Sequence, residues 1–389
     1  MKTALSTPLP RNERVHGRQI AFAAAFLLPI SKFLEVPSLL AQYAAGDLLV
    51  PALLHFLLQS LVLAALLYAA TRSETPLIER LHNALGKWTI AVYIFFGIYF
   101  LYAAVIPLLD LDKFVYAAFF DTEPTFFSFG LFFLLSAFIC TKGLKAVGRS
   151  ADLCLFLFVI PFLALIVMSL WETDFSHLLP LFGTKFGDTM SSFTYTTPQF
   201  SDAVLLLPLI SCSSVDKKDA KKIMTGYWIG ALCVLTFLAV FFGTYSSLAP
   251  REHYAFAKIA QYFPALAVVG RIDLIFIYLL TVVLLFYTCL PLQYATDLFA
   301  RTLKTNRRTW IAAALSLLGF LFFLFANHFY NSLYAFIAGI PLIFWLIADL
   351  IPLLCLLLPA NDKKNKPSSS PNSSNANVPF KRKKENDYA

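Results

Sequence analysis

The chain has 389 residues, of which 59% are hydrophobic, 40 are Phe and only 14% are charged. Soluble domains are about half apolar and about a quarter charged, so this composition and the mean hydropathy of +0.70 exclude a soluble globular protein. Apolar runs of about 20 residues recur along the chain, and each is long enough to cross about 30 Å of hydrocarbon as a helix. The sequence therefore predicts an all-α polytopic membrane protein.

Ten membrane spans are predicted in chain order. They cover residues 19–43, 46–70, 88–109, 125–141, 150–170, 188–213, 222–243, 271–297, 309–327 and 331–358. The chain then divides into a cytoplasmic N-terminus (1–18), a permease-like transmembrane domain (19–358) and a basic cytoplasmic tail (359–389). The tail is rich in Ser, Asn and Pro and is expected to be disordered.

Lys and Arg lie mainly on one side of this predicted topology. The segments expected in the cytoplasm hold 25 of the 31 Lys and Arg residues, and the expected outer loops hold five. The loop over 110–123 is acidic and is expected outside. Because cytoplasmic loops carry an excess of Lys and Arg, both termini are predicted to be cytoplasmic. The net charge of +8 then reflects topology and not nucleic-acid binding. The tail motif KRKK (381–384) either contacts anionic lipid or simply follows the same rule.

Proline and polar residues interrupt the first and sixth spans. The first span contains PISKFLEVP, with Pro29 and Pro37 on either side of Lys32 and Glu35. The sixth span begins with a hydroxyl-rich stretch that ends at Pro198, and an apolar run follows. Proline removes a backbone hydrogen bond, so both helices are expected to be discontinuous.

The two interrupted spans lie five apart and cross the membrane in opposite directions. This spacing predicts two inverted repeats of five helices, a LeuT-like arrangement with discontinuous helices 1 and 6. Broken helices at matching positions of two repeats indicate a ligand site near the middle of the membrane.

Charged residues inside a span are costly and usually functional. Lys32 neutralises a ligand carboxylate, Glu35 carries a coupling proton, or the two form an internal ion pair three residues apart. Asp202 either faces the same cavity or, like Ser201, caps the following helix. Tyr93, Tyr99 and Tyr102 lie at helical spacing in the third span. Such a stripe usually packs against neighbouring helices, and the alternative is that one tyrosine reaches the cavity. The predicted ligand-binding residues are Ser31, Lys32, Glu35, Thr197, Gln199, Ser201, Asp202 and Tyr93.

No motif predicts catalysis, a metal site or a cofactor. The six Cys residues are scattered singly, and the six His residues form no spaced pair. The sequence contains no HExxH, GxSxG or phosphate-loop motif, so we do not expect an enzyme.

An ordered set of motifs resembles the B subunit of spore germinant receptors, within the amino acid–polyamine–organocation superfamily. The set comprises ten spans with breaks in spans 1 and 6, HLLPLFGTKFGD before span 6, QFSDAVLLLPLI within it, the basic loop VDKKDAKKIM and YFPALAVVGRIDLIFIYLL entering span 8. The resemblance runs from about residue 15 to 358.

This resemblance implies an integral subunit in the inner membrane of a spore, or in the cell membrane, that senses a small nutrient, usually an amino acid. It also implies an A subunit and a lipoprotein C subunit as partners. The family's first break typically contains glycine, whereas PISKFLEVP contains none. Glycine lets backbone approach a ligand closely, so the departure implies a side-chain-based site, a different ligand or lost ligand binding.

A proton-coupled amino acid permease is the alternative function, with Glu35 or Asp202 carrying the proton. A third alternative is a structural partner that binds no ligand. A transporter must release its substrate inside, whereas a sensor needs only to shift a conformational population. The sequence alone does not separate these functions.

Overall fold

The computed structural model describes residues 15–357 apart from 73–76, 120–124, 181, 212, 214, 262–272 and 306. Every regular element in these residues is a helix, which confirms the predicted all-α class. The predicted tail and the entry into span 8 lie outside the described residues, as does nearly all of the N-terminal segment.

Six helices are long and apolar enough to cross a membrane. They are α3 (Leu49–Thr71), α5 (Thr89–Phe119), α7 (Leu144–Ser169), α10 (Lys217–Tyr245), α13 (Asp273–Thr302) and α14 (Arg308–His328). A seventh candidate is a bent pair of helical segments, Gly17–Phe33 and Val36–Asp47. The shorter helices include α6 (Thr125–Thr141) and α15 (Tyr330–Ala338). The last helical stretch is apolar and consists of α16 (Pro341–Trp345), a π-helical turn (Leu346–Leu350) and α17 (Ile351–Leu354). The multi-pass membrane class is therefore supported, while the count of ten spans in two repeats stays a prediction.

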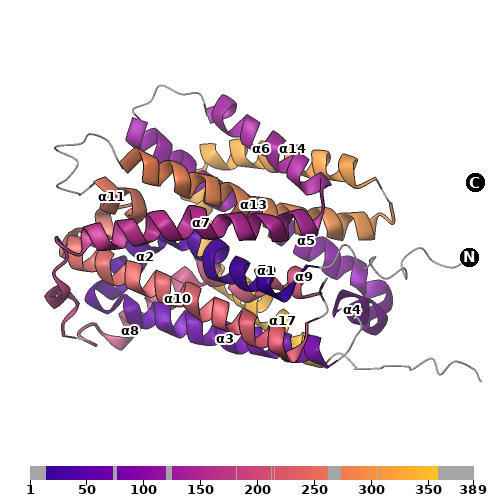
Figure 1. Ribbon diagram of the computed structural model, residues 1–389, viewed down its shortest axis with the longest axis horizontal. Coiled ribbons are helices and arrows are strands. Elements are labelled where there is room, and N and C mark those ends of the chain that lie inside the picture. The colour runs from indigo at the N-terminus through magenta and orange to yellow at the C-terminus, as the bar shows by residue number, and fades with distance from the viewer. Residues whose placement is uncertain are drawn as a thin grey trace, which may run out of the picture.

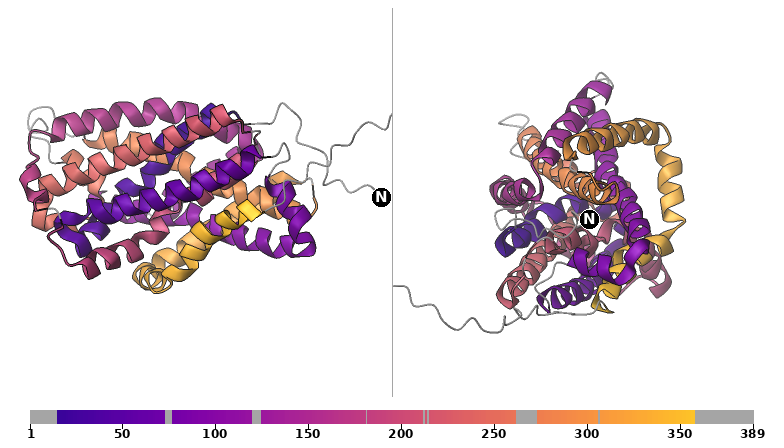
Figure 2. Two further views of the ribbon diagram at one scale, coloured as in Figure 1. Left: turned by 90° about the horizontal axis from the view of Figure 1, so that it is seen from below. Right: turned by 90° about the vertical axis from the view of Figure 1, so that its right-hand side faces the viewer.

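The long helices run side by side along the long axis of the molecule (Figure 1). Helix α13 packs against α5 and α7, α14 against α6, and α10 against α3. Figure 2 shows the same bundle from below and end-on. The short helices α4 (Leu77–Leu85) and α11 (Ala255–Gln261) lie at opposite ends of the bundle, which we call the α4 end and the α11 end.

Large apolar side chains cover the outside of the bundle. Leu61 on α3, Phe156 on α7 and Phe325 on α14 are 62%, 65% and 65% exposed. An exposed apolar surface on several long helices is expected where lipid, and not water, surrounds the protein. This surface supports the membrane assignment independently of helix length.

The first span is interrupted where its prolines predict. It starts as α1 (Gly17–Phe22), continues as a π-helical turn (Ala23–Leu27) and a 3-10 turn (Leu28–Phe33), and resumes as α2 (Val36–Ala44). The two halves are bent by 64°. Pro29 lies in the first turn of the 3-10 segment and Pro37 in the first turn of α2, where a missing N–H costs least.

The sixth predicted span is also interrupted at its proline. Helix α8 (Phe186–Thr196) gives way to a 3-10 turn (Thr197–Phe200), and α9 (Asp202–Ser211) begins after the non-helical Ser201. The hydroxyls of α8 donate back to carbonyls one turn earlier, for example Thr194 to Met190 at 2.9 Å. These local bonds allow a hydroxyl-rich helix to lie in the bundle.

Helix α5 corrects the predicted end of the third span. The span was expected to end at residue 109, with an acidic outer loop from Asp110, but the helix continues to Phe119. Asp110 and Asp112 are only 8% and 6% exposed. Their carboxylates are satisfied by other helices, since Tyr330 donates to Asp110 and Asn327 donates to Asp112. Charge alone therefore did not mark the end of this helix.

Two glycines let α10 approach the first half of the broken first span. A Cβ atom at Gly226 would lie against the backbone carbonyl oxygen of Ala21, closer than real Cβ atoms come. A Cβ at Gly230 would lie 2.7 Å from the carbonyl oxygen of Ala24. This is the small-xxx-small contact by which membrane helices pack closely. The motif GYWIG was visible in the sequence, but its partner helix was not.

Replacing Gly226 with Ala is expected to destabilise the protein by about 1–3 kcal/mol, because the added methyl group meets backbone that cannot rotate away. Thermal unfolding of the purified protein in nanodiscs measures the loss. The control is Gly187→Ala in α8, where a Cβ would meet no atom within 4 Å. Equal stability of the two variants would contradict the close packing of α1 on α10.

Asp47 fastens the loop before α8 to the turn between α2 and α3. Its carboxylate accepts hydrogen bonds from the backbone N–H groups of Phe182 and Thr184 at 2.6 and 2.7 Å. It also accepts one from the Thr184 hydroxyl at 2.6 Å. Asp47 thus holds residues 182–184 of the HLLPLFGTKFGD segment, which positions the start of α8.

Asp47→Ala is expected to release this loop, because three donors lose one acceptor. The exposed Lys185 follows the loop directly, so limited trypsin digestion of the protein in nanodiscs should cleave there faster in the variant. Glu172→Ala removes an exposed carboxylate from a neighbouring loop and serves as the control. Unchanged cleavage in Asp47→Ala would show that the loop is held by other contacts.

Candidate functional site

An ion pair joins the two broken spans. The Lys32 ammonium lies 2.6 Å from the Asp202 carboxylate, although 170 residues separate them. The two side chains are 1% and 4% exposed. Lys32 belongs to the 3-10 turn of the first break, and Asp202 is the first residue of α9 after the second. The pair therefore holds the breaks against each other in the apolar interior.

Aromatic and hydroxyl groups surround this pair. The Lys32 ammonium lies 5.4 Å from the centre of the Phe200 ring, a distance at which the ring face attracts a cation. The Tyr99 hydroxyl of α5 donates to the Ser201 hydroxyl at 2.6 Å. These contacts tie the second break to α5 as well as to the first span.

Glu35 does not share the partner of Lys32. The segment between Leu28 and Glu35 is not a continuous α-helix, so the face that two residues three apart would share is lost. Glu35 instead accepts a hydrogen bond from the Tyr330 hydroxyl at 2.8 Å, and the same hydroxyl lies 3.2 Å from Asp110. The internal Lys32–Glu35 pair considered from the sequence is replaced by contacts to two other helices, from Lys32 to Asp202 of α9 and from Glu35 to Tyr330 of α15.

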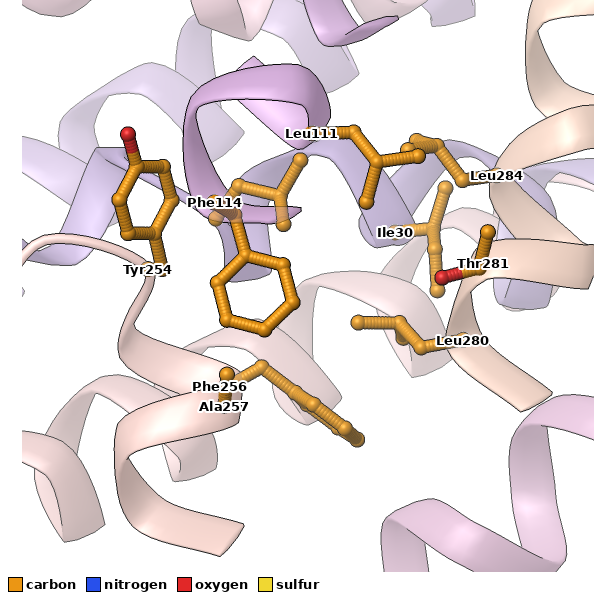
Figure 3. Close-up of a pocket in the computed structure, with 10 residues that line it drawn as sticks. Ile30, Leu111, Phe114, Tyr254, Phe256, Ala257, Leu280, Thr281 and Leu284 are labelled. Carbon is orange, nitrogen blue, oxygen red and sulfur yellow. The ribbon is translucent and has the colours of Figure 1, made fainter. Parts of the chain in front are cut away.

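The backbone of the first break is satisfied by α11. The Leu34 carbonyl accepts a hydrogen bond from the Ala255 N–H at 3.0 Å. Figure 3 shows Tyr254, Phe256 and Ala257 packed around the adjoining apolar cavity, which has a volume of about 10 Å³. Irregular backbone inside a membrane needs such protein partners. The segment before and within α11 thus stabilises the break at the α11 end of the bundle.

A more polar cavity lies between the two breaks. It is lined by Ser31 from the first break, Gln199 and Ser201 from the second, Tyr99, Tyr102 and Asp110 from α5, and Tyr287 from α13. Its volume is about 50 Å³. A cavity of this volume admits water. Ligand pockets usually measure about 300–1,000 Å³, so a ligand requires the helices around this cavity to separate.

Three of the eight predicted site residues, Ser31, Gln199 and Ser201, line this cavity, and the other five do not. Lys32 and Asp202 form the ion pair beside it, and Glu35 bonds to Tyr330. Thr197 accepts a hydrogen bond from the Trp345 indole N–H at 2.9 Å and so joins the second break to the last helical stretch. Tyr93 lines a different, apolar cavity together with Leu77 and Leu81 of α4. Of the tyrosine stripe in the third span, Tyr99 and Tyr102 reach the central cavity and Tyr93 does not.

A second polar link, whose partners the sequence did not predict, joins α3 to α9 and to the last helical stretch. Gln59 of α3 donates to the Asp349 carboxylate at 2.6 Å and accepts from the Ala203 N–H of α9 at 3.1 Å. His55, one turn earlier on α3, contacts the Phe193 carbonyl at 2.8 Å. The sequence did contain a sign of this link, because His55 and Gln59 are polar residues four positions apart in an otherwise apolar run. That spacing places both side chains on one face of a helix. In the described part of the chain, no group of three or more His, Cys, Asp or Glu side chains is arranged to hold a metal.

A family model described as spore germination protein matches residues 33–331, more than three quarters of the chain. The chain belongs to the spore germination protein family. No curated protein matches it. The matched residues include the second break and Asp202. Lys32 lies just before the first matched residue, and Asp349 lies after the last.

Removing one member of the Lys32–Asp202 pair should destabilise the protein strongly. A buried charge left without its partner costs about 3–5 kcal/mol, whereas replacing both charges with apolar groups is often neutral. Lys32→Met and Asp202→Leu are therefore each expected to lower the unfolding temperature of the protein in nanodiscs.

The Lys32→Met/Asp202→Leu double variant is expected to recover most of the unfolding temperature that either single variant loses. Such recovery is a coupling energy, which a double-mutant cycle measures directly. Additive losses would mean that the two side chains do not depend on each other. Lys222→Met at the exposed Lys222–Asp219 pair, which lies on the surface of α10, is the control and should change stability by less than about 1 kcal/mol.

Proposed function

We propose that the chain is the integral membrane subunit of a nutrient germinant receptor, which binds a small amino-acid-like ligand in the central cavity. The observation that carries this proposal is the cavity itself, because residues from both broken spans line it. Interrupted helices that meet around a polar cavity are the usual setting of ligand sites in transporter-like folds. Membership of the germination family supplies the biological context.

The proposal includes the topology and partners that the sequence predicts. The ten spans form two inverted repeats of five helices, both termini face the cytoplasm, and the α4 end is the cytoplasmic end. The protein lies in the spore inner membrane with an A subunit and a lipoprotein C subunit. In this arrangement the ligand reaches the cavity from the α11 end, where Tyr330 bridges Glu35 and Asp110.

A proton-coupled amino acid permease is the second candidate. Buried carboxylates close to the cavity favour it, because Asp110 lines the cavity and Asp202 pairs with Lys32 beside the lining residue Ser201. The two functions differ in one respect, since a permease must also open toward the α4 end and release its ligand there.

The test uses purified full-length protein in proteoliposomes with a panel of radiolabelled amino acids. Binding and uptake are recorded separately, with and without a proton gradient. Saturable binding without accumulation is expected for the receptor subunit. Gradient-driven accumulation would establish the permease, and absence of binding across the panel would contradict both.

Ala103→Leu places a larger side chain in the cavity wall and is expected to weaken binding at least about tenfold. The control is Ala64→Leu, the same substitution at an exposed position on α3. Size-exclusion profiles establish that both variants are folded. Unchanged binding in a folded Ala103→Leu variant would place the ligand elsewhere.

A further inference from the structure

Asp349 is a buried carboxyl group that does not line the central cavity. It lies in the π-helical turn of the last helical stretch and is 7% exposed. Its Oδ1 atom accepts a hydrogen bond from the Gln59 amide at 2.6 Å. Its Oδ2 atom is buried and has no hydrogen-bond partner among the residues that the structure describes. Because π-helical turns are frequent at functional sites and buried polar atoms are rarely left unpaired, both features indicate a second site.

The backbone of α9 determines which group Gln59 offers to Asp349. The Ala203 N–H can only donate, so the Gln59 atom that lies 3.1 Å from it is the amide oxygen. The amide nitrogen therefore faces Asp349 and donates to it. A metal ion bound at Oδ1 would be repelled by this N–H group, and the described part of the chain holds no cluster of three metal-binding side chains. The site thus suits a proton and not a metal ion.

Among the described residues, no cation pairs with Asp349. The Lys32 ammonium lies at the first break, but it is already paired with Asp202 at 2.6 Å. Tyr99 of α5 and Tyr227 of α10 lie within electrostatic range of Asp349, and a tyrosine brings no positive charge. A negative charge on Asp349 would therefore be uncompensated by these groups.

His55 of α3 is also committed to other partners. It is 1% exposed, and its Nε2 atom contacts the Phe193 carbonyl at 2.8 Å and the Thr196 hydroxyl at 3.1 Å. Its ring stacks on those of Phe193 and Phe200, with ring centres 4.1 and 4.4 Å away. A carboxylate without a counter-charge is costly in an apolar interior, whereas a protonated carboxyl group is neutral. This arrangement of the helices is therefore one that favours a neutral Asp349.

Two contacts connect the turn that contains Asp349 to the second break. Gln59 joins the carboxyl group to the N–H of Ala203 in the first turn of α9. Four residues before Asp349, the Trp345 indole N–H donates to the Thr197 hydroxyl at 2.9 Å. The last helical stretch thus holds the second break on both sides of the residues that line the central cavity.

We propose that Asp349 is a proton-binding site, and that the proton bound there keeps the last helical stretch against the second break. When the O–H bond of Asp349 breaks, its proton passes to a water molecule and a carboxylate remains. The last helical stretch then separates from α3 and α9 so that water reaches this charge, and the second break is released. The site is distinct from Glu35 and Asp202, to which the sequence assigned a coupling proton. The inference does not depend on which ligand the central cavity binds.

The first experiment detects the protonated carboxyl group itself. Infrared spectra of the full-length protein are recorded near neutral pH in ether-linked lipid, which has no ester carbonyl to obscure the C=O stretch of a carboxylic acid. Asp349→Asn is expected to remove one carboxylic acid band. The matched control is Asp47→Asn, which should remove none, because the Asp47 carboxylate accepts three hydrogen bonds and stays ionised. Loss of an ionised carboxylate band in Asp349→Asn, with every carboxylic acid band retained, overturns the proposal.

The second experiment measures what the proton does to stability. Unfolding temperatures of the unmodified protein and of Asp349→Asn are compared in nanodiscs from about pH 5 to about pH 9. Asparagine resembles the neutral acid, so the two proteins should match at low pH. As the pH rises, the unmodified protein should lose stability relative to the variant, because only its folded state must give up a bound proton. Asp47→Asn should differ from the unmodified protein by a constant amount over this range. A constant difference for Asp349→Asn as well overturns the proposal.

The third experiment measures release of the second break. Gln199→Cys is introduced into a full-length chain whose six native cysteines are replaced by alanine, and it is treated with the small neutral reagent methyl methanethiosulfonate. Relative to free cysteine at the same pH, its reaction is expected to accelerate as the pH rises, by up to about tenfold per pH unit, the limit for one proton. Adding Asp349→Asn should abolish this acceleration, and adding Asp47→Asn should preserve it. Equal acceleration with and without Asp349→Asn overturns the proposal.

Discussion

The contact between Lys32 and Asp202 is the interaction on which the rest of the site depends. Two spans that lack continuous helical hydrogen bonding must meet inside an apolar bundle, and this ion pair joins them at the point where each is interrupted. A buried pair is stabilising only when both members are present and well oriented, so it also fixes how the breaks face each other. The polar cavity lies beside it, lined by residues from both breaks.

The surrounding helices supply the groups that the interrupted backbone lacks. Helix α11 donates to the Leu34 carbonyl, and Gln59 of α3 accepts from the Ala203 N–H. Gly226 and Gly230 bring α10 close to the first half of the broken span. Several helices therefore hold the two breaks in place. The opposite wall of the cavity comes from α5 and carries Tyr99, Tyr102 and Asp110. Movement of α5 relative to the breaks is the simplest way to enlarge the cavity.

The sequence predicted the features that depend on local chemistry. Proline acts on its own turn, so the interruptions at Pro29 and Pro198 could be placed without a structure. The partner of Lys32 could not, because it lies 170 residues away and the choice between Glu35 and Asp202 depends on packing. The end of α5 was misplaced for the same reason, since distant side chains satisfy Asp110 and Asp112.

The most direct test of this account is the distance between the Lys32 Nζ and Asp202 Cγ atoms in lipid bilayers. Solid-state NMR of protein labelled with ¹⁵N-lysine and ¹³C-aspartate detects such contacts through dipolar coupling. The account predicts a strong Lys–Asp coupling that disappears in Lys32→Met, in addition to the one made by Lys222 and Asp219. A spectrum in which Lys32→Met removes no coupling would show that the two breaks are not joined by this pair.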